Sequence, residues 1–276
     1  MNKLFVIKIG GNVIDNEENL SSFLRSFASI KSNKILVHGG GKIATKIGEQ
    51  LGIKSKYING RRITDNDTID LVTMVYGGLV NKKIVAQLQA KGCNAIGLTG
   101  ADANIIPAKK RPPVSLSFGE GRGEVGVVDF GWVGDIDSEK IIINNLKLIM
   151  EIGITSVFAP LTHDGDGHVL NTNADTIASA LAIALSQYYD VRLIYCFEKK
   201  GILENVEDEN SVIRNINKEK YRQLLNEKKL FEGIIPKIDN AFAAIDAGVK
   251  EVLIGDAKDL LQNVTDETVG TLIYRT

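Results

Sequence analysis

Residues 4–11 read L-F-V-I-K-I-G-G, and residues 34–41 read K-I-L-V-H-G-G-G. Both stretches are short apolar runs, typical of strands, that end in consecutive glycines. Apolar runs without polar alternation indicate strands of a parallel sheet that is covered on both faces. These two stretches therefore predict an α/β protein whose strands end in glycine-rich loops.

The same pattern continues outward along the chain, where strand-like runs alternate with amphipathic helical segments. The predicted strands are Leu4–Ile9, Lys34–Val37, Asn94–Leu98, Ser156–Pro160, Arg192–Cys196 and Glu251–Ile254. The predicted helices are Glu17–Ile30, Lys42–Leu51, Asp67–Ala90, Ser138–Glu151, Ala174–Ser186, Lys218–Glu227 and Pro236–Ala247. We expect one domain over residues 1–276, with an N-lobe of about 1–172 and a C-lobe of about 173–276.

Two segments interrupt this alternation. Lys109–Val128 contains Pro112, Pro113 and several glycines between short alternating runs, which predicts a β-hairpin inserted on one edge. Thr162–His168 is rich in aspartate and glycine, but it lacks the spacing of a calcium-binding loop. We interpret it as a hairpin turn and expect no metal site in the protein.

The composition excludes several classes of function. The chain has 33 basic and 34 acidic residues, a formal net charge of -1, so nucleic acid is not an expected partner. No apolar run approaches the roughly 18 residues of a membrane span. Cys93 and Cys196 lie far apart in apolar runs and do not form a metal-type pair. The protein is expected in the reducing cytoplasm, away from the membrane.

Lys8 lies inside an apolar strand, directly before Gly10 and Gly11. A buried ammonium group is costly unless it contacts a partner or a ligand. Open α/β sheets bind ligands at the carboxyl ends of their strands, where glycine amides can approach phosphate oxygens. The sequence leaves two interpretations open: a phosphate-binding lysine, or an edge lysine that reaches water beside an ordinary turn.

The motif His38–Gly41 also follows a strand and precedes a helix that begins near Lys42. Three consecutive glycines suggest that a ligand approaches the backbone, and the helix N-terminus provides an anion site. His38 itself is interpreted as a packed, hydrogen-bonded histidine. Farther along, Arg62 in Asn59–Thr64 could offer a planar fork to a carboxylate, although a surface arginine is equally compatible with the sequence.

Two helix starts carry further candidates. Asn173 is predicted to cap a helix, which leaves Asp175 in the first turn and Asn171 outside the helix. Pro236 fits the first helical position, so Lys237 falls in the first turn. A lysine there opposes the helix dipole, which suggests that a ligand anion compensates its charge.

The order of these motifs resembles the amino-acid kinase family, in particular its kinases of N-acylated glutamate. The resemblance covers essentially the whole chain and includes V-N-K at Val80–Lys82 and V-G-D-I at Val133–Ile136. It implies a three-layer αβα sandwich around a mainly parallel, eight-stranded sheet. It also implies that ATP with Mg²⁺ phosphorylates the side-chain carboxylate of N-acetylglutamate, a step of arginine biosynthesis. The N-lobe would bind the acylglutamate and the C-lobe would bind ATP.

The resemblance also implies roles for particular residues. Lys8 and Lys237 resemble the two lysines that stabilise the transition state of phosphoryl transfer, and Asp175 resembles the acid that holds them in place. The residues that match the acylglutamate-binding positions are Gly40, Gly41, Arg62 and Asn171. Gly10 and Gly11 match the glycine turn beneath the transferring phosphate.

This chain departs from the family pattern at several points. Cys196 and Phe197 stand where the family usually has a Ser/Thr-Asp pair, and Arg61 stands where a hydrophobic residue is usual. Arg61 could serve an acyl group with its own carboxylate, such as succinyl, or could face solvent. The extra N-terminal helix of hexameric, arginine-inhibited members is absent, so a homodimer without that feedback is expected.

Three other functions are compatible with parts of the sequence. One is a related kinase that acts on another carboxylate or phosphate, such as an aminoadipate-type kinase. Another is a non-catalytic amino-acid sensor of the same fold. Such domains can dispense with the reactive lysines and aspartate, whereas Lys8, Asp175 and Lys237 are all present in this chain. The third is an oxidoreductase, but no G-x-G-x-x-G follows the first strand.

Overall fold

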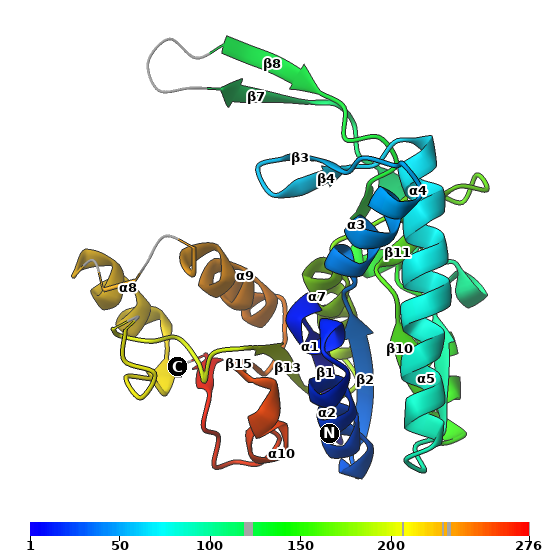
Figure 1. Cartoon of the computed structure of the whole chain (residues 1–276). Helices are drawn as coiled ribbons and strands as arrows, with labels where there is room; N and C mark the ends of the chain where they lie inside the picture. The colour runs from blue at the N-terminus through cyan, green and yellow to red at the C-terminus, as the bar shows by residue number, and fades with distance from the viewer. Residues whose placement is uncertain (119–123, 206, 228, 231–232, 276) are drawn as a thin grey trace.

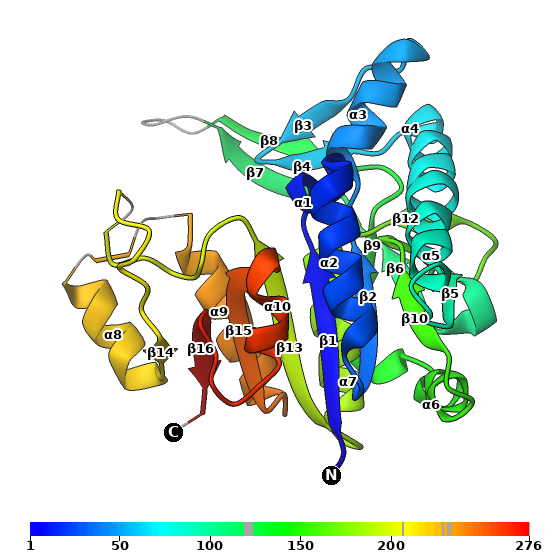
Figure 2. The same ribbon diagram turned by 60° about the horizontal axis from the view of Figure 1, so that its bottom comes forward.

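The computed structural model describes residues 1–118, 124–205, 207–227, 229–230 and 233–275. Its centre is an eight-stranded sheet with the strand order β14-β16-β15-β13-β1-β2-β10-β5 (Figure 2). In that order the strands are Asn215–Ile216, Thr271–Tyr274, Glu251–Asp256, Asp190–Phe197, Lys3–Ile9, Asn33–His38, Thr155–Phe158 and Ala95–Leu98. β15 and β16 are antiparallel, and the other neighbouring pairs are parallel.

The central strand β1 shows why the sheet is covered on both faces. Its side chains alternate between two separate hydrophobic cores, as the pleat of a strand requires. Leu4 and Val6 lie in one core, and Phe5, Ile7 and Ile9 lie in the other. Lys8 continues the series of Leu4 and Val6, so its side chain starts out on the face of the first core.

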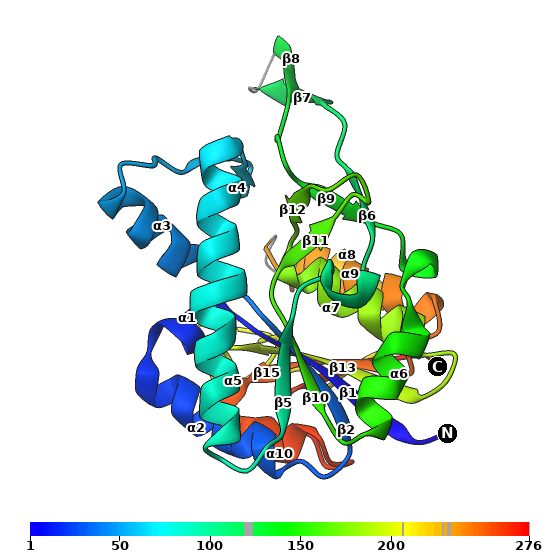
Figure 3. The same cartoon turned by 90° about the vertical axis from the view of Figure 1, so that its right-hand side faces the viewer.

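Helices cover both faces of the sheet (Figure 3). The face that carries Leu4 and Val6 packs against α6 (Ile143–Glu151), α7 (Ala174–Leu185) and α9 (Ile235–Asp246). The opposite face packs against α2 (Glu17–Ser29), α5 (Asn81–Gln89) and α10 (Leu260–Asn263). The remaining α-helices are α1 (Gly11–Asp15), α3 (Gly41–Gln50), α4 (Asn66–Val72) and α8 (Lys218–Asn226). The predicted three-layer αβα sandwich is confirmed.

Four two-stranded sheets accompany the main one. The antiparallel pairs are β3 (Lys56–Ile58) with β4 (Arg61–Ile63), β6 (Ala108–Lys110) with β9 (Gly134–Ile136), β7 (Val114–Phe118) with β8 (Glu124–Val128), and β11 (Leu161–His163) with β12 (Val169–Asn171). The predicted hairpin insertion is confirmed as β7–β8. Figure 1 shows that it extends away from the body of the protein, and it does not join the edge of the main sheet.

All the predicted strands and helices are present, but some boundaries differ. The predicted helix Asp67–Ala90 is divided into α4, a π-helical segment at Thr73–Val80, and α5. The predicted helix Ser138–Glu151 begins with a 3-10 turn at Ser138–Lys140, and α6 starts only at Ile143. Segments of two to five residues are too short to show a period, and the elements not predicted are α1, α10, β3, β4, β6, β9, β14 and β16. Two further 3-10 turns lie at Asp102–Asn104 and Ala257–Asp259.

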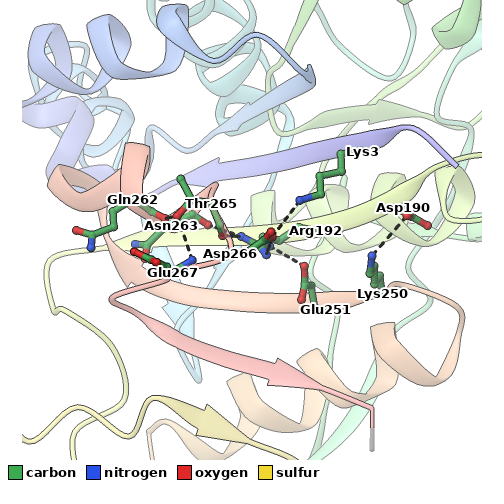
Figure 4. A network of polar contacts seen from close by, with 10 residues as sticks. All are labelled: Lys3, Asp190, Arg192, Lys250, Glu251, Gln262, Asn263, Thr265, Asp266 and Glu267. Carbon is green, nitrogen blue, oxygen red and sulfur yellow. Dashed lines mark hydrogen bonds and ion pairs between the residues drawn. The ribbon is translucent and has the colours of Figure 1, made fainter.

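A polar network connects the amino ends of β1, β13 and β15 (Figure 4). These ends lie at the opposite end of the strands from the glycine loops. The buried Arg192 guanidinium donates to Glu251 Oε1 at 2.8 Å and to the carbonyl oxygens of Asn263 and Thr265 at 2.8 and 2.5 Å. Asp266 forms an ion pair with Lys3 at 3.0 Å. The buried Arg192 guanidinium is paired within the protein, so removal of Glu251 would leave an uncompensated buried charge and destabilise the fold.

In the part of the chain that the structure describes, none of the helices has the length and apolar character needed to span a membrane. The cytoplasmic location stays a prediction.

Candidate active site

Two glycine loops meet at the carboxyl edge of the sheet, where β1 and β2 run side by side. Gly10 and Gly11 follow β1, and Gly39 to Gly41 follow β2. The Gly39 amide donates to the Ile9 carbonyl at 3.2 Å, and a Cβ at Gly39 would lie 3.9 Å from the amide nitrogen of Gly11. The two predicted phosphate-side and substrate-side loops are therefore in contact.

Gly40 is required by both its backbone and its surroundings. Its φ of 157° is a value that L-residues rarely adopt, and a Cβ would lie 3.0 Å from the ring of Tyr76. Tyr76 lies in the π-helical segment Thr73–Val80, which the sequence did not distinguish from ordinary helix. A side chain at residue 40 would strain the backbone and would require the Tyr76 ring to shift.

Lys8 lies beside the first glycine loop and is almost fully buried. Its Nζ is 2.7 Å from Asp175 Oδ1, and the Lys8 side chain is 10% exposed while that of Asp175 is 38% exposed. A Cβ at Gly10 would lie 4.0 Å from the same Nζ. The lysine thus has an anionic partner on one side and the glycine backbone on the other. The alternative of an edge lysine that reaches water is wrong, because this ammonium is inside the protein.

Asp175 is placed by the start of α7. Asn173 caps this helix, and its side chain accepts hydrogen bonds from the amides of Asp175 and Thr176, as predicted. Residue 175 therefore falls in the first turn, where the helix dipole stabilises a carboxylate. The cap fixes the direction of the Asp175 side chain toward the end of β1.

Lys237 enters the same region from α9. The helix begins at Ile235, one residue earlier than predicted, and Lys237 still falls in its first turn. Its Nζ lies 3.8 Å from the centre of the Phe197 ring. The pKa of Lys237 is lowered, mainly by desolvation and also by Lys8, while the Asp175 and Glu198 carboxylates act to raise it. Among the described residues no carboxylate lies within 4.0 Å of Lys237, so Asp175 pairs with Lys8 and acts on Lys237 only at longer range.

The end of β13 contains the residues that depart from the family pattern. Cys196 is buried, and burial raises the pKa of its thiol to about 12, so it stays protonated. Tyr195 lies on the same face as Lys8, its partner in the β1–β13 register, and its hydroxyl donates to the Asp175 carbonyl at 3.4 Å. Phe197, two residues farther along, shares that face.

Arg62 lies on β4 and its guanidinium is already held by the protein. Nη2 donates to the Gly41 carbonyl at 3.0 Å and to Thr45 Oγ1 at 2.9 Å, and Nη1 donates to Ser55 Oγ. The guanidinium also stacks on the Tyr57 ring at 4.9 Å. Arg62 is buried, so the alternative of a solvent-exposed surface arginine is wrong.

Asn171 and His38 complete the set of predicted residues. Asn171 ends β12, and its Nδ2 donates to Thr64 Oγ1 at 3.0 Å. His38 is fully buried between the Gly39 carbonyl at 2.7 Å and Asn81 Nδ2 at 3.1 Å. Burial lowers the pKa of His38 to about 4, so the ring is neutral at pH 7 and is a packed histidine, as expected.

A cavity of about 660 Å³ opens between these loops and the helices α7 and α9. The predicted residues that line it are Gly40, Gly41, Arg62, Asn171 and Asp175, whereas Lys8, Lys237, Gly10 and Gly11 lie outside its lining. Arg61 also lines the cavity and is exposed.

The sequence missed Tyr76, Arg111 and Phe130, which line the same cavity. Arg111 forms an ion pair with Asp135, with its Nε 3.0 Å from Oδ1. Neither Arg111 nor Phe130 belongs to a motif from which a role could be predicted, and contacts between distant segments place both at the cavity. The Arg111 amide donates to the Val133 carbonyl at 2.7 Å, and the Thr64 amide donates to the Phe130 carbonyl at 2.9 Å. Tyr76 was hidden within a helical pattern that looked continuous.

The predicted hairpin turn in Thr162–His168 is present between β11 and β12, although Thr162 and His163 belong to β11 and the turn begins at Asp164. Asp164 accepts hydrogen bonds from the Asp166 and His168 amides and pairs with the His168 ring at 2.7 Å. Over the described ranges of the chain, no group of three or more His, Cys, Asp or Glu side chains is arranged to hold a metal ion.

The geometry places two lysines and a carboxylate beside an arginine-lined cavity, and the comparison with known proteins agrees with it. The model of the amino acid kinase family matches residues 3–256. This chain belongs to the amino acid kinase family.

Curated relatives are similar over almost their whole length. An acetylglutamate kinase from Cytophaga hutchinsonii is 54% identical, with 98% of each chain covered. An acetylglutamate kinase from Phocaeicola vulgatus is 50% identical, with 99% of each chain covered. The resemblance found in the motifs of this amino acid kinase is therefore confirmed at full length.

Solved structures share the fold. A Streptococcus mutans protein has a TM-score of 0.72 and 28% identity, and covers 99% of this chain and 98% of its own. A Giardia carbamate kinase has a TM-score of 0.69 at 13% identity, with 100% of this chain and 99% of its own covered, which shows the fold alone.

Proposed function

We propose that this amino acid kinase transfers the γ-phosphoryl group of ATP to the side-chain carboxylate of N-acetylglutamate. A carboxylate oxygen forms the new bond to the γ-phosphorus, and the bond from that phosphorus to the β–γ bridging oxygen breaks. ADP leaves with the bonding electron pair. The observation that carries the proposal is the Lys8–Asp175 ion pair, with Lys237 nearby, at the end of an arginine-lined cavity.

The chemistry needs charge more than it needs a base. A carboxylate nucleophile is already ionised at neutral pH, so no group has to remove a proton from it. The neutral, buried His38 fits this requirement, because it is not available as a base. The difficulty is bringing an anion onto a phosphate chain, and Lys8 and Lys237 are the cations placed to stabilise the charge that develops there.

The acylglutamate would bind at the N-lobe side of the cavity. Gly40 and Gly41 offer backbone amides at the start of α3, and Arg62 and Asn171 lie on β4 and β12 around the same space. Arg62 Nη2 already donates to the Gly41 carbonyl and to Thr45 Oγ1. A substrate carboxylate would therefore replace or share these acceptors to obtain a two-point contact.

ATP would bind on the C-lobe side, next to α9 and the end of β13, with its phosphates at Gly10 and Gly11. The described residues lack a metal-binding group of their own, so Mg²⁺ would be held by the phosphate oxygens of ATP. When bound, it neutralises part of the phosphate charge. The division into lobes at residues 172 and 173 follows the turn before α7, although the sheet itself is continuous.

The homodimer expected from the sequence remains part of this proposal. Strand β5 forms one edge of the sheet, and Ile96 on it is 39% exposed. Leu148 on α6 and Ile152 just after it are 59% and 71% exposed. An apolar surface beside an open edge is a suitable place for a second copy of the chain.

Measurement of ADP release with N-acetylglutamate, N-succinylglutamate and free glutamate tests the reaction. Hydroxylamine added to the assay should convert the acyl phosphate product into a hydroxamate. Turnover with an N-acylglutamate and hydroxamate formation in equal amounts support the proposal. ADP release that does not depend on an acylglutamate, or no release at all, contradicts it.

Replacing Arg62 by lysine is expected to raise the KM for acylglutamate about tenfold or more, with the KM for ATP nearly unchanged. A point charge cannot reproduce the fork that now holds the Gly41 carbonyl and Thr45. Steady-state kinetics with each substrate varied in turn checks this result. A matching loss for both substrates would instead indicate a defect in folding or lobe closure.

A second substrate is favoured by one observation, since the exposed Arg61 lines the same cavity as Arg62. If Arg61 contacts the acyl group, N-succinylglutamate should be accepted at least as well as N-acetylglutamate. A pair between a second carboxylate and a guanidinium contributes roughly 1.5–3 kcal/mol, which is tenfold or more in affinity.

Replacing Arg61 by leucine is expected to remove the succinyl preference and to leave acetyl turnover intact. Because specificity is a difference of affinities, kcat/KM must be measured for both substrates on both proteins. The wild-type enzyme and the leucine variant could both strongly prefer the acetyl substrate. That result would show that Arg61 faces solvent and does not contact the acyl group.

A further inference from the structure

We propose that Phe197 is a positioning residue whose aromatic face holds the ammonium of Lys237, and to a lesser degree that of Lys8, beside the reacting phosphate. This inference rests on the proposed phosphoryl transfer, because it assigns the ring a task within the same cluster. The ring would position the two lysines without contacting the reacting atoms itself.

Both ammonium groups lie near the Phe197 ring. Lys237 Nζ lies 3.8 Å from the centre of the Phe197 ring, and Lys8 Nζ lies 5.3 Å from it. Both distances fall within the roughly 6 Å over which a cation is attracted to the face of an aromatic ring. The lysines come from β1 and α9, which are far apart in the sequence, so Phe197 is a shared contact that links them.

The ring is itself held in place. Phe197 is the last residue of β13, it is partly buried against the core of α7 and α9, and its ring stacks on that of Tyr195 with centroids 6.3 Å apart. Tyr195 in turn donates to the Asp175 carbonyl. Movement of the Phe197 side chain is therefore limited by the same residues that position Asp175.

The electrostatics explain why Lys237 needs this contact more than Lys8. Lys8 has the Asp175 carboxylate at 2.7 Å, whereas the described residues place no carboxylate within 4.0 Å of Lys237. Lys237 also sits in the first turn of α9, where the helix dipole disfavours a cation. Lys8 adds repulsion, because it lowers the pKa of Lys237. Asp175 and Glu198 favour the charged form of Lys237 from beyond 4.0 Å, and the face of Phe197 lies 3.8 Å from the half-buried ammonium.

A neutral ring suits this task better than a carboxylate would. A second aspartate beside Lys237 would neutralise its charge and compete with phosphate for its N–H donors. An aromatic face attracts the ammonium but leaves its full positive charge and its donors available to a ligand.

A fluorination series at Phe197 tests the inference, since fluorine weakens the negative face of the ring and changes its shape little. Site-specific incorporation of 4-fluoro-, 3,5-difluoro- and 3,4,5-trifluorophenylalanine should lower kcat stepwise, by about tenfold at the last member. The KM for acylglutamate should stay within about twofold, because the ring does not contact it. Phe197→Leu should match or exceed the largest loss, and Phe197→Trp should retain most of the activity.

The same series at Phe242 is the matched control. Phe242 lies on α9 as Lys237 does, it is buried, and it packs against Tyr221 at 5.5 Å. Fluorination there disturbs packing around the same helix without changing a ring that lies beneath Lys237. An equal decline of kcat at residues 197 and 242 would mean that Phe197 acts by packing alone, and would overturn the inference.

A second readout does not depend on turnover. The pKa of Lys237, followed by NMR with ¹³Cε-labelled lysine and assigned by Lys237→Arg, should fall stepwise with fluorination at Phe197. A pKa and a kcat that both stay constant across the series overturn the inference. An enzyme that phosphorylates no acylglutamate but shows the stepwise pKa would refute the proposed function and leave the contact of Phe197 with Lys237 supported.

Discussion

Replacing Lys8 by alanine is expected to lower kcat by about 10²–10³-fold, with a much smaller change in the KM for acylglutamate. The ammonium is buried at the end of β1, 2.7 Å from Asp175 and beside the Gly10 backbone, where the charge of a transferring phosphoryl group would develop. An interaction that is stronger in the transition state than in the bound substrate reduces kcat when it is lost. Steady-state kinetics with both substrates measures the effect.

Lys34→Ala is a suitable control, because Lys34 is also a buried lysine on a strand of the same sheet. Its ammonium donates to the Ala28 and Ile30 carbonyls and lies over the Phe27 ring, at the opposite end of the strands. Loss of Lys34 should lower the midpoint of thermal unfolding and leave kcat near the wild-type value. A Lys8→Ala enzyme with near-wild-type kcat would remove Lys8 from the mechanism.

Replacing Lys237 by alanine is expected to produce a loss of similar size, about 10²–10³-fold in kcat. This lysine opposes the dipole of α9 and is paired with no carboxylate within 4.0 Å among the described residues, so its charge is available to a ligand. Its removal should leave the fold intact, and the unfolding midpoint is expected to change little. Single-turnover measurements would show whether the loss lies in the chemical step.

Lys218→Ala provides the control for this second substitution. Lys218 begins α8 and pairs with Asp246 of α9 at 2.7 Å, but its side chain is 44% exposed and does not line the cavity. Removal of an exposed pair typically costs little stability, and kcat should be unchanged. If Lys218→Ala and Lys237→Ala reduce kcat equally, the effect reflects the charge of the helix surface and not a contact with phosphate.

Much of the fold was predictable because each strand and helix shows a local pattern. The apolar runs that became β1, β2, β10 and β13 require burial on both faces, which only a covered parallel sheet provides. The cap at Asn173 was also predictable, since it depends on one side chain and the two amides that follow it. The short strands β14 and β16 were missed because a sheet edge is defined by its neighbour and not by a period of its own.

The candidate site divides in the same way. The glycine loops, Lys8 and Lys237 were found from the sequence, because each conflicts with its local environment unless a ligand or partner is present. Asp175 fits its place in the first turn of α7, and only the resemblance to the family indicated a role for it. Burial of Arg62 and the stacking of Lys237 on Phe197 could not be found in this way. Both depend on contacts between residues that are distant in the chain. Arg62 and the Gly41 carbonyl are 21 residues apart, and Lys237 and Phe197 are 40 residues apart.

Local patterns in the sequence are sufficient to predict an α/β protein with glycine loops after its strands. They also identify two lysines in unfavourable positions, Lys8 in an apolar strand and Lys237 in the first turn of a helix. That much follows from local rules of burial, backbone freedom and helix dipoles. Which charges lie together depends on the tertiary structure: Asp175 is paired with Lys8, and the Lys237 ammonium lies over the Phe197 ring. The physical reason is that electrostatic interactions depend on distance in space, and the sheet order that brings β1, β13, α7 and α9 together is set by the packing of the whole chain.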